Sequence, residues 1–123
     1  IYSGLFAVIG HIYPFYLNFK GGKGVASFLG IYVGIDYEFG VTLCLMLFIL
    51  TLIINYIGLT GIILYLLSPF LIFTLTKSIT VSVSTGIVCL IGLYKHRKNI
   101  YNIYQGKEMG IREFIFEKII KRN

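Results

Sequence analysis

The sequence predicts an all-α membrane protein, a polytopic helix bundle in which a half-helix follows a glycine-rich loop. Three observations support this fold class. The 123 residues are 57% hydrophobic and only 13% charged, with a mean hydropathy of +0.85, which is more apolar sequence than a soluble domain can bury. Apolar runs near the length of a membrane span recur along the chain. Basic residues gather in particular loops, as they do on the cytoplasmic side of membrane proteins.

The chain is expected to begin inside a helix. Its first residue is Ile rather than Met, and the apolar run 1–9 is about half of the ~20 residues that a span requires. We therefore expect an N-terminally truncated piece of a larger protein, in which residues 1–123 form one integral membrane domain. Cys44 and Cys89 are single residues within apolar runs, which argues against a disulfide-stapled secreted fold.

Three later segments, at about 39–57, 59–76 and 79–94, are apolar over nearly the length of a span. The segment Val25 to Ile35 is shorter, and at a rise of ~1.5 Å per residue it covers about half of a ~30 Å hydrocarbon core. It is predicted as a half-helix. A polar stretch at 18–24 precedes it, and an acidic link at 36–38 follows it.

The basic residues predict the topology. Counting crossings puts the loops at 11–24, 55–61 and from 95 onward on one face, which is cytoplasmic by the positive-inside rule. From residue 95 on, eight basic side chains stand against three acidic ones. We expect 96–123 to be a cytoplasmic basic tail that is amphipathic from Ile111, serving either as a surface anchor or as a lipid sensor. In so apolar a chain this charge indicates the membrane and not nucleic acid.

A loop with three glycines and two lysines, in the sequence FKGGKG, stands directly before the half-helix. Glycines let backbone amides approach an anion, the helix start adds unpaired N–H groups, and the lysines supply full charges. Phosphate is the anion that this combination suits. The alternative is an ordinary flexible, basic loop. A Walker A motif is absent. The candidate phosphate-binding residues are Lys20, Gly21, Gly22, Lys23 and Gly24.

Two histidines lie near the same predicted face. His11 follows the truncated first helix and either caps its C-terminus or belongs to the site. His96 and Asn99 are three residues apart and so share a helical face. They are either the flank of the last span or ligands that converge on the anion held by Lys23. His11 and His96 lack partner ligands at metal-site spacing, so neither a metal nor a cofactor is expected.

Two long motifs resemble one family. GHIYPFYLNFKGGKGVA (Gly10 to Ala26) resembles the second signature of the acyl-phosphate:glycerol-3-phosphate acyltransferases, the PlsY family, and HRKNIYNIYQGKE (His96 to Glu108) resembles the third. The resemblance implies a fragment of a fold of about seven helices, multi-pass in the bacterial inner membrane with its site facing the cytoplasm. The chain resembles the C-terminal two-thirds of that fold. The first signature, with a Ser-x-Asn-x-Gly pattern, would lie upstream.

The same resemblance implies the chemistry. Family members transfer an acyl group from acyl-phosphate to the sn-1 hydroxyl of glycerol 3-phosphate and form lysophosphatidic acid for phospholipid synthesis. This fragment alone is expected to be inactive. Lys23, His96 and Asn99 resemble the family's catalytic and phosphate-binding residues, while His11 and Glu108 resemble structural positions of the signatures.

One stretch departs from the family pattern. In NYIGLTG, at 55–61, family members usually carry serines, one of them a phosphate ligand, where Gly58 and Gly61 stand here. Thr60 is adjacent and offers a hydroxyl, although its direction on a helix differs by about 100° from that of Gly61.

Two other interpretations of the chain stay open. The half-helix also suits an anion transporter with a re-entrant helix, and the basic loop also suits a structural membrane subunit without a ligand. The expected partners of the enzyme are acyl-phosphate, glycerol 3-phosphate and the lipid bilayer. The oligomeric state is left open, a monomer included.

Overall fold

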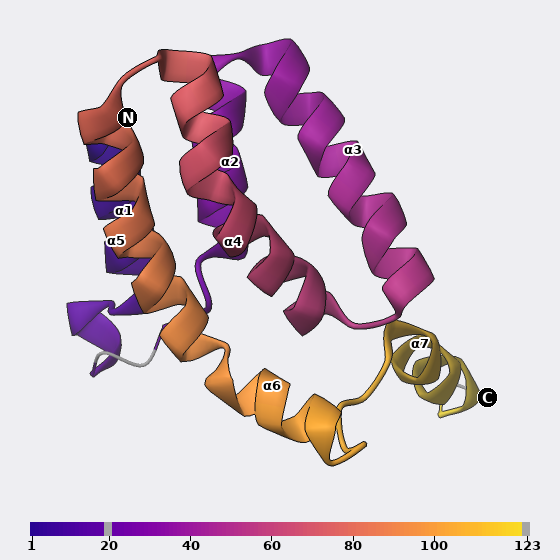
Figure 1. The fold of residues 1–123 in the computed structure, drawn as a ribbon. Coiled ribbons are helices and arrows are strands. Elements are labelled where there is room, and N and C mark those ends of the chain that lie inside the picture. The colour runs from indigo at the N-terminus through magenta and orange to yellow at the C-terminus, as the bar shows by residue number, and fades with distance from the viewer. Residues whose placement is uncertain (19–20, 122–123) are drawn as a thin grey trace.

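A computed structural model describes residues 1–18 and 21–121 of the chain. It is an all-helical bundle (Figure 1), as the sequence predicts, and no strand occurs among the described residues. A short 3-10 turn, η1, covers Phe15–Leu17. The α-helices are α1 (Tyr2–Ile12), α2 (Val25–Ile35), α3 (Tyr37–Ile54), α4 (Ile57–Thr76), α5 (Ile79–Lys95), α6 (Arg97–Tyr104) and α7 (Ile111–Ile120).

The predicted spans correspond to α3, α4 and α5. In the described part of the chain, α3 and α4 are each long and apolar enough to cross a membrane, and the pair α5 and α6 meets the same criteria together despite a bend of 46° between them. Helix α2 is a shorter apolar helix over the residues predicted for the half-helix. At ~1.5 Å per residue it reaches about half-way across a ~30 Å core.

Local chemistry sets the helix ends. Asp36 caps the start of α3, where its Oδ1 accepts a hydrogen bond of 2.9 Å from the Phe39 amide, and Ser78 does the same for α5. Asn55 and Lys77 close α3 and α4 in the left-handed conformation, with φ of 70° and 53°. These polar residues stop otherwise uniform apolar runs by satisfying helix-end backbone groups or turning the chain.

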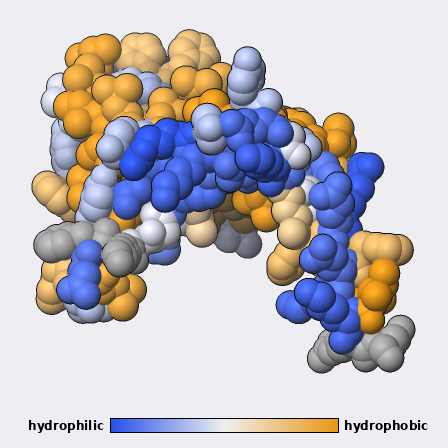
Figure 2. All heavy atoms as spheres, turned by 90° about the horizontal axis from the view of Figure 1, so that it is seen from below, coloured by the Kyte–Doolittle hydropathy of each residue, from blue (hydrophilic) through white to orange (hydrophobic). Residues whose placement is uncertain are grey.

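The links between helices fall at two opposite ends of the bundle. Figure 1 shows the α2–α3 and α4–α5 links at the top, and the α3–α4 turn, the loop before α2 and helix α6 at the bottom. These three segments therefore lie at one end of the bundle, as the sequence predicts. Seen from that end, hydrophilic residues gather across the middle of the molecule, and α7 projects beside them (Figure 2).

The core lies between α1, α2, α4 and α5. Helix α3 contributes little to it, since Gly40 is its one buried residue, and its outer side exposes large apolar side chains such as Phe48 and Ile53. Exposed apolar surface of this extent is typical of a lipid-facing helix. The buried core residues are Leu5, Val8, Ile12, Phe28, Ile31, Tyr32, Leu64, Tyr65, Ile72, Val88 and Cys89.

Helices α4 and α5 pack tightly at Tyr65 and Gly92. Tyr65 is fully buried, and three carbons of its ring lie only 2.5–2.8 Å from the position that a Cβ on Gly92 would occupy. No side chain fits there without moving the ring. Glycine at 92 is therefore required by packing, and it lets a large aromatic side chain lie directly on the backbone of α5.

We expect Gly92→Ala to destabilise the full-length protein, because the new methyl group overlaps the Tyr65 ring and overpacking of a core costs about 1–3 kcal/mol. Gly86→Ala, on the same helix, is the control: its nearest neighbour atom is Pro69 Cγ, at an ordinary 3.8 Å. The thermal unfolding midpoint in detergent is expected to fall only in Gly92→Ala. Equal midpoints for the two variants would contradict this packing argument.

Candidate active site

The loop before α2 folds back onto the end of α1. A Cβ on Gly21 would overlap the backbone carbonyl oxygens of His11 and Ile12, and one on Gly22 would overlap the His11 imidazole. Gly24, which precedes α2, has φ of +79°, a conformation that favours glycine. The glycines are thus needed for close approach and for the turn into α2. Lys20 lies outside the described residues.

Tyr65 holds this loop to the centre of the bundle. Its hydroxyl donates a hydrogen bond of 2.7 Å to the backbone oxygen of Lys23. The ring of the same tyrosine packs edge-on against the imidazole of His96, with centroids 5.7 Å apart. Tyr65, a buried side chain of α4, therefore contacts both Lys23 and His96 and sets their positions.

His96 lies at the bend between α5 and α6 and is buried, with 1% of its surface exposed. Its Nδ1 lies 2.9 Å from the carbonyl oxygen of Gly92. That oxygen can only accept, so Nδ1 carries a proton, and the neutral ring keeps a free lone pair on Nε2. Burial lowers the pKa of the imidazole, and the nearby positive charge of Lys23 lowers it further, against the opposing effect of the Gly92 hydrogen bond.

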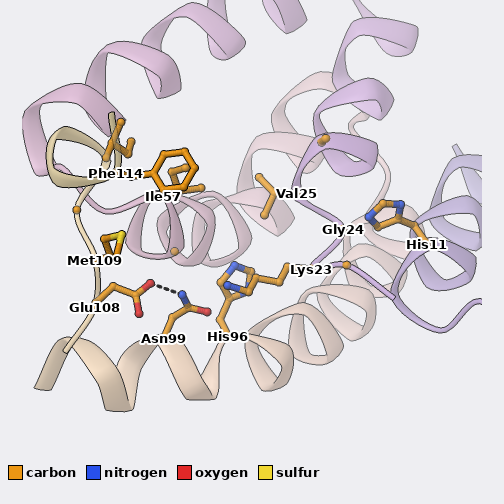
Figure 3. Close-up of a pocket in the computed structure, with 15 residues that line it drawn as sticks. His11, Lys23, Gly24, Val25, Ile57, His96, Asn99, Glu108, Met109 and Phe114 are labelled. Carbon is orange, nitrogen blue, oxygen red and sulfur yellow. Dashed lines mark hydrogen bonds between the residues drawn. The ribbon is translucent and has the colours of Figure 1, made fainter. Parts of the chain in front are cut away.

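Lys23 is exposed to the cavity and extends toward the imidazole of His96 (Figure 3). Asn99 follows His96 by one helical turn on α6 and is buried. Its Nδ2 donates a hydrogen bond to Glu108 Oε1. Glu108 thereby orients the Asn99 amide, which lines the cavity.

The two glycines that depart from the family pattern lie directly beneath these side chains. A Cβ on Gly58 would stand 2.7 Å from Asn99 Nδ2, and one on Gly61 would stand 2.8 Å from His96 Nε2. A serine at 58 or 61 would therefore require the side chain of Asn99 or His96 to shift. Thr60 faces another way, because its hydroxyl bonds the Tyr56 carbonyl oxygen and lies 3.1 Å from the Thr51 hydroxyl on α3.

A cavity of about 660 Å³ opens at this end of the bundle (Figure 3). Five predicted ligands line it, together with His11 and Glu108, whereas Gly21 and Thr60 do not. Sequence reasoning missed Tyr65 and the apolar lining residues, because no local motif marks them. The predicted ligands that line the cavity are Gly22, Lys23, Gly24, His96 and Asn99.

A model of the glycerol-3-phosphate acyltransferase family matches residues 1–106. The chain belongs to this family. Glycerol-3-phosphate acyltransferases of Geotalea daltonii and Ehrlichia canis are each 37% identical to it, over 86% and 89% of the chain and 55% and 56% of the relatives. The enzyme of a Staphylococcus aureus strain is 35% identical over 89% of the chain and 54% of its own length. The chain thus spans about half the length of the curated relatives it matches.

Two solved structures of PlsY, an integral membrane glycerol 3-phosphate acyltransferase, share the fold. The glycerol 3-phosphate form has a TM-score of 0.78 and 28% identity over 89% of the chain and 55% of that structure. The lysophosphatidic acid form has a TM-score of 0.73 and 28% identity over 92% and 58%. The resemblance that the two signatures indicate is therefore confirmed for the family and for the fold.

Removing the Tyr65 hydroxyl is expected to weaken anion binding, because the Lys23 backbone loses its hydrogen-bond donor. A net loss of about 0.5–1.5 kcal/mol corresponds to a two- to tenfold lower affinity. Tyr65→Phe in the full-length protein is compared with Tyr32→Phe, whose buried hydroxyl donates to the Ser68 carbonyl oxygen away from the cavity. Calorimetry with inorganic phosphate should show the loss in Tyr65→Phe alone. Equal affinities in both variants would refute the role of Tyr65.

The imidazole of His96 is expected to titrate below its usual pKa of 6.5 in the ligand-free protein, since burial disfavours its charged form. An anion bound next to Lys23 favours the imidazolium, so inorganic phosphate should raise this pKa. Histidine NMR titration of the full-length protein measures both values, and His96→Asn identifies the signal. A pKa above 6.5 without phosphate, or one that phosphate leaves unchanged, would contradict this geometry.

Proposed function

We propose that the protein, at the full length of its relatives, transfers an acyl group from acyl-phosphate to the sn-1 hydroxyl of glycerol 3-phosphate. The products are lysophosphatidic acid and inorganic phosphate, in bacterial phospholipid synthesis. The names of the relatives support this activity. So do the two structural neighbours, which are described as the glycerol 3-phosphate form and the lysophosphatidic acid form of PlsY.

The observation that carries the proposal is the meeting of Lys23, His96 and Asn99 in one cavity at the N-terminus of α2. Both substrates carry a phosphate. The lysine charge and the unpaired amides of the helix start are suited to hold such groups. When phosphate binds beside Lys23, it favours protonation of Nε2 of His96, which then donates a hydrogen bond to it.

In the proposed reaction, the glycerol hydroxyl oxygen forms a bond to the acyl carbon, and the bond from that carbon to the phosphate oxygen breaks. The electron pair leaves with phosphate, and a phosphate oxygen takes up the hydroxyl proton. Lys23 and the helix-start amides stabilise the charge that develops on the leaving group, and the cavity orients the two substrates. The reaction requires no metal or cofactor, and phosphate is a good leaving group without one.

The remaining residues have supporting roles in the proposal. Glu108 orients Asn99, and His11 forms the surface on which the glycine loop folds. Residues 1–123 act as one integral membrane domain in the bacterial inner membrane, with the basic tail 96–123 and the cavity on the cytoplasmic side. This orientation places glycerol 3-phosphate, a water-soluble substrate, at the open end of the bundle.

An anion transporter is the second candidate, and the short helix α2 favours it, since half-helices with their N-termini at an anion occur in transporters. The two functions differ in their products. Proteoliposomes that hold the full-length protein should convert acyl-phosphate and glycerol 3-phosphate to lysophosphatidic acid, without net movement of phosphate across the bilayer. Phosphate flux without covalent product would favour the transporter.

Lys23→Ala in the full-length protein is expected to lower kcat/KM by about 10- to 150-fold, the effect of losing a charge-assisted contact of about 1.5–3 kcal/mol. Lys98→Ala is the control, because it removes an equal charge from an exposed position of α6 that does not line the cavity. The formation of labelled lysophosphatidic acid in membranes measures the rates. A folded wild-type protein without product, or equal rates in the two variants, would overturn the proposal.

A further inference from the structure

The last helix, α7, has no role assigned by the resemblance. The family match ends at residue 106, and α7 begins at Ile111. Its side chains are nonetheless part of the cavity, because Ile111 and Phe114 line it together with Met109, which immediately precedes the helix start. A segment outside the family match thus forms one wall of the candidate site.

Asn55 fixes α7 in this place. The first amides of a helix have no acceptor within it, and here two of them find acceptors on one residue of the α3–α4 turn. The Ile111 amide donates to the Asn55 backbone oxygen, and the Arg112 amide donates to Asn55 Oδ1, each over 2.9 Å. The Arg112 guanidinium also donates to the Leu52 carbonyl oxygen over 3.1 Å. A Cβ on Gly110 would overlap the Asn55 side chain, so the attachment is close.

The cavity has a polar end and an apolar end. In Figure 3, Lys23 lies toward one end, and His96 and Asn99 lie in the middle with Glu108 between Asn99 and Met109. Ile57 and Phe114 gather beyond Met109 at the other end. Ile57 is 65% exposed and Phe114 is 54% exposed, so their apolar surface is available to a ligand. A molecule that fits both ends has an anionic group joined to a hydrocarbon chain.

We propose that Phe114 and Ile111 of α7, with Ile57, bind the acyl chain of the acyl-phosphate and set the chain-length preference of the enzyme. This inference rests on the proposed function, which supplies the donor. The phosphate occupies the end at Lys23, and the chain runs from there along α7. Each methylene group buried in this way raises affinity by about fourfold, so a wall of two or three apolar side chains is enough to discriminate between donors.

The first test compares donors of two lengths, decanoyl phosphate and hexadecanoyl phosphate, in the full-length protein. Phe114→Ala and Ile111→Ala are expected to lower the ratio of kcat/KM for the long donor to that for the short donor by about fivefold or more, and to leave the KM for glycerol 3-phosphate unchanged. Asn55→Ala, which removes the Oδ1 acceptor of the Arg112 amide and so loosens the attachment of α7, should lower the ratio in the same direction. Phe116→Ala is the matched control, because Phe116 lies on the same helix, is 66% exposed and does not line the cavity.

The second test does not depend on turnover. The chain has no Trp, so Phe114→Trp and Phe116→Trp place a fluorescent reporter on either position, with the parent protein as background. A brominated alkyl phosphate is expected to quench the reporter at 114 more strongly than that at 116. Excess inorganic phosphate should relieve only the quenching at 114, because it displaces the ligand and leaves partitioning into the bilayer unaffected.

The outcomes separate the two proposals. An unchanged chain-length ratio in Phe114→Ala and Ile111→Ala, or equal quenching at 114 and 116, overturns the role of α7 even when the wild-type protein makes lysophosphatidic acid. If the wild-type protein makes no lysophosphatidic acid but phosphate-sensitive quenching occurs at 114, the acyltransferase proposal fails. The role of α7 in binding the hydrocarbon chain of an alkyl phosphate then still holds.

Discussion

The hydrogen bond from the Tyr65 hydroxyl to the Lys23 backbone oxygen is the contact on which the rest of the site depends. A loop with three glycines loses much conformational entropy when it is ordered, so a charged side chain on it needs an external support. Tyr65 gives that support from the centre of α4, and its ring also packs against His96. Gly92 makes the arrangement possible, because a side chain there would displace the ring. The contacts of Tyr65 therefore determine both the core packing and the geometry of the site.

Close approach of glycine backbones to neighbouring groups shapes the site. Gly21 and Gly22 lie against the end of α1, and Gly58 and Gly61 lie beneath Asn99 and His96. Small residues at helix contacts are typical of membrane proteins, where apolar side chains gain little by leaving lipid and tight packing must hold the helices together. The result is a cavity in which few polar side chains are present, and His96 and Asn99 are each held by a hydrogen bond.

The sequence predicts the helices well because the signals for them are local. Glycines and lysines before Val25 and the acidic link after Ile35 delimit α2, and apolar length identifies α3 and α4. The convergence of Lys23, His96 and Asn99 follows from counting crossings and from the family signatures. The role of Tyr65 and the docking of α7 on Asn55 could not be predicted in this way, because they join residues 42 and 57 positions apart. Such contacts depend on how the helices pack, and no motif marks them.

For the proposed acyl-phosphate donor, the place of the cavity meets two conflicting requirements. A phosphate at the middle of a bilayer would lose its hydration at a large free-energy cost, while an acyl chain is stable only in an apolar environment. The N-terminus of the short helix α2 brings unpaired amides to the same end of the bundle as the 46° bend between α5 and α6. Lys23, at the polar end of the cavity, is exposed, and Ile57 and Phe114 expose apolar surface at the other end. A charged group and a hydrocarbon chain on one molecule can thus each lie in the environment that suits it.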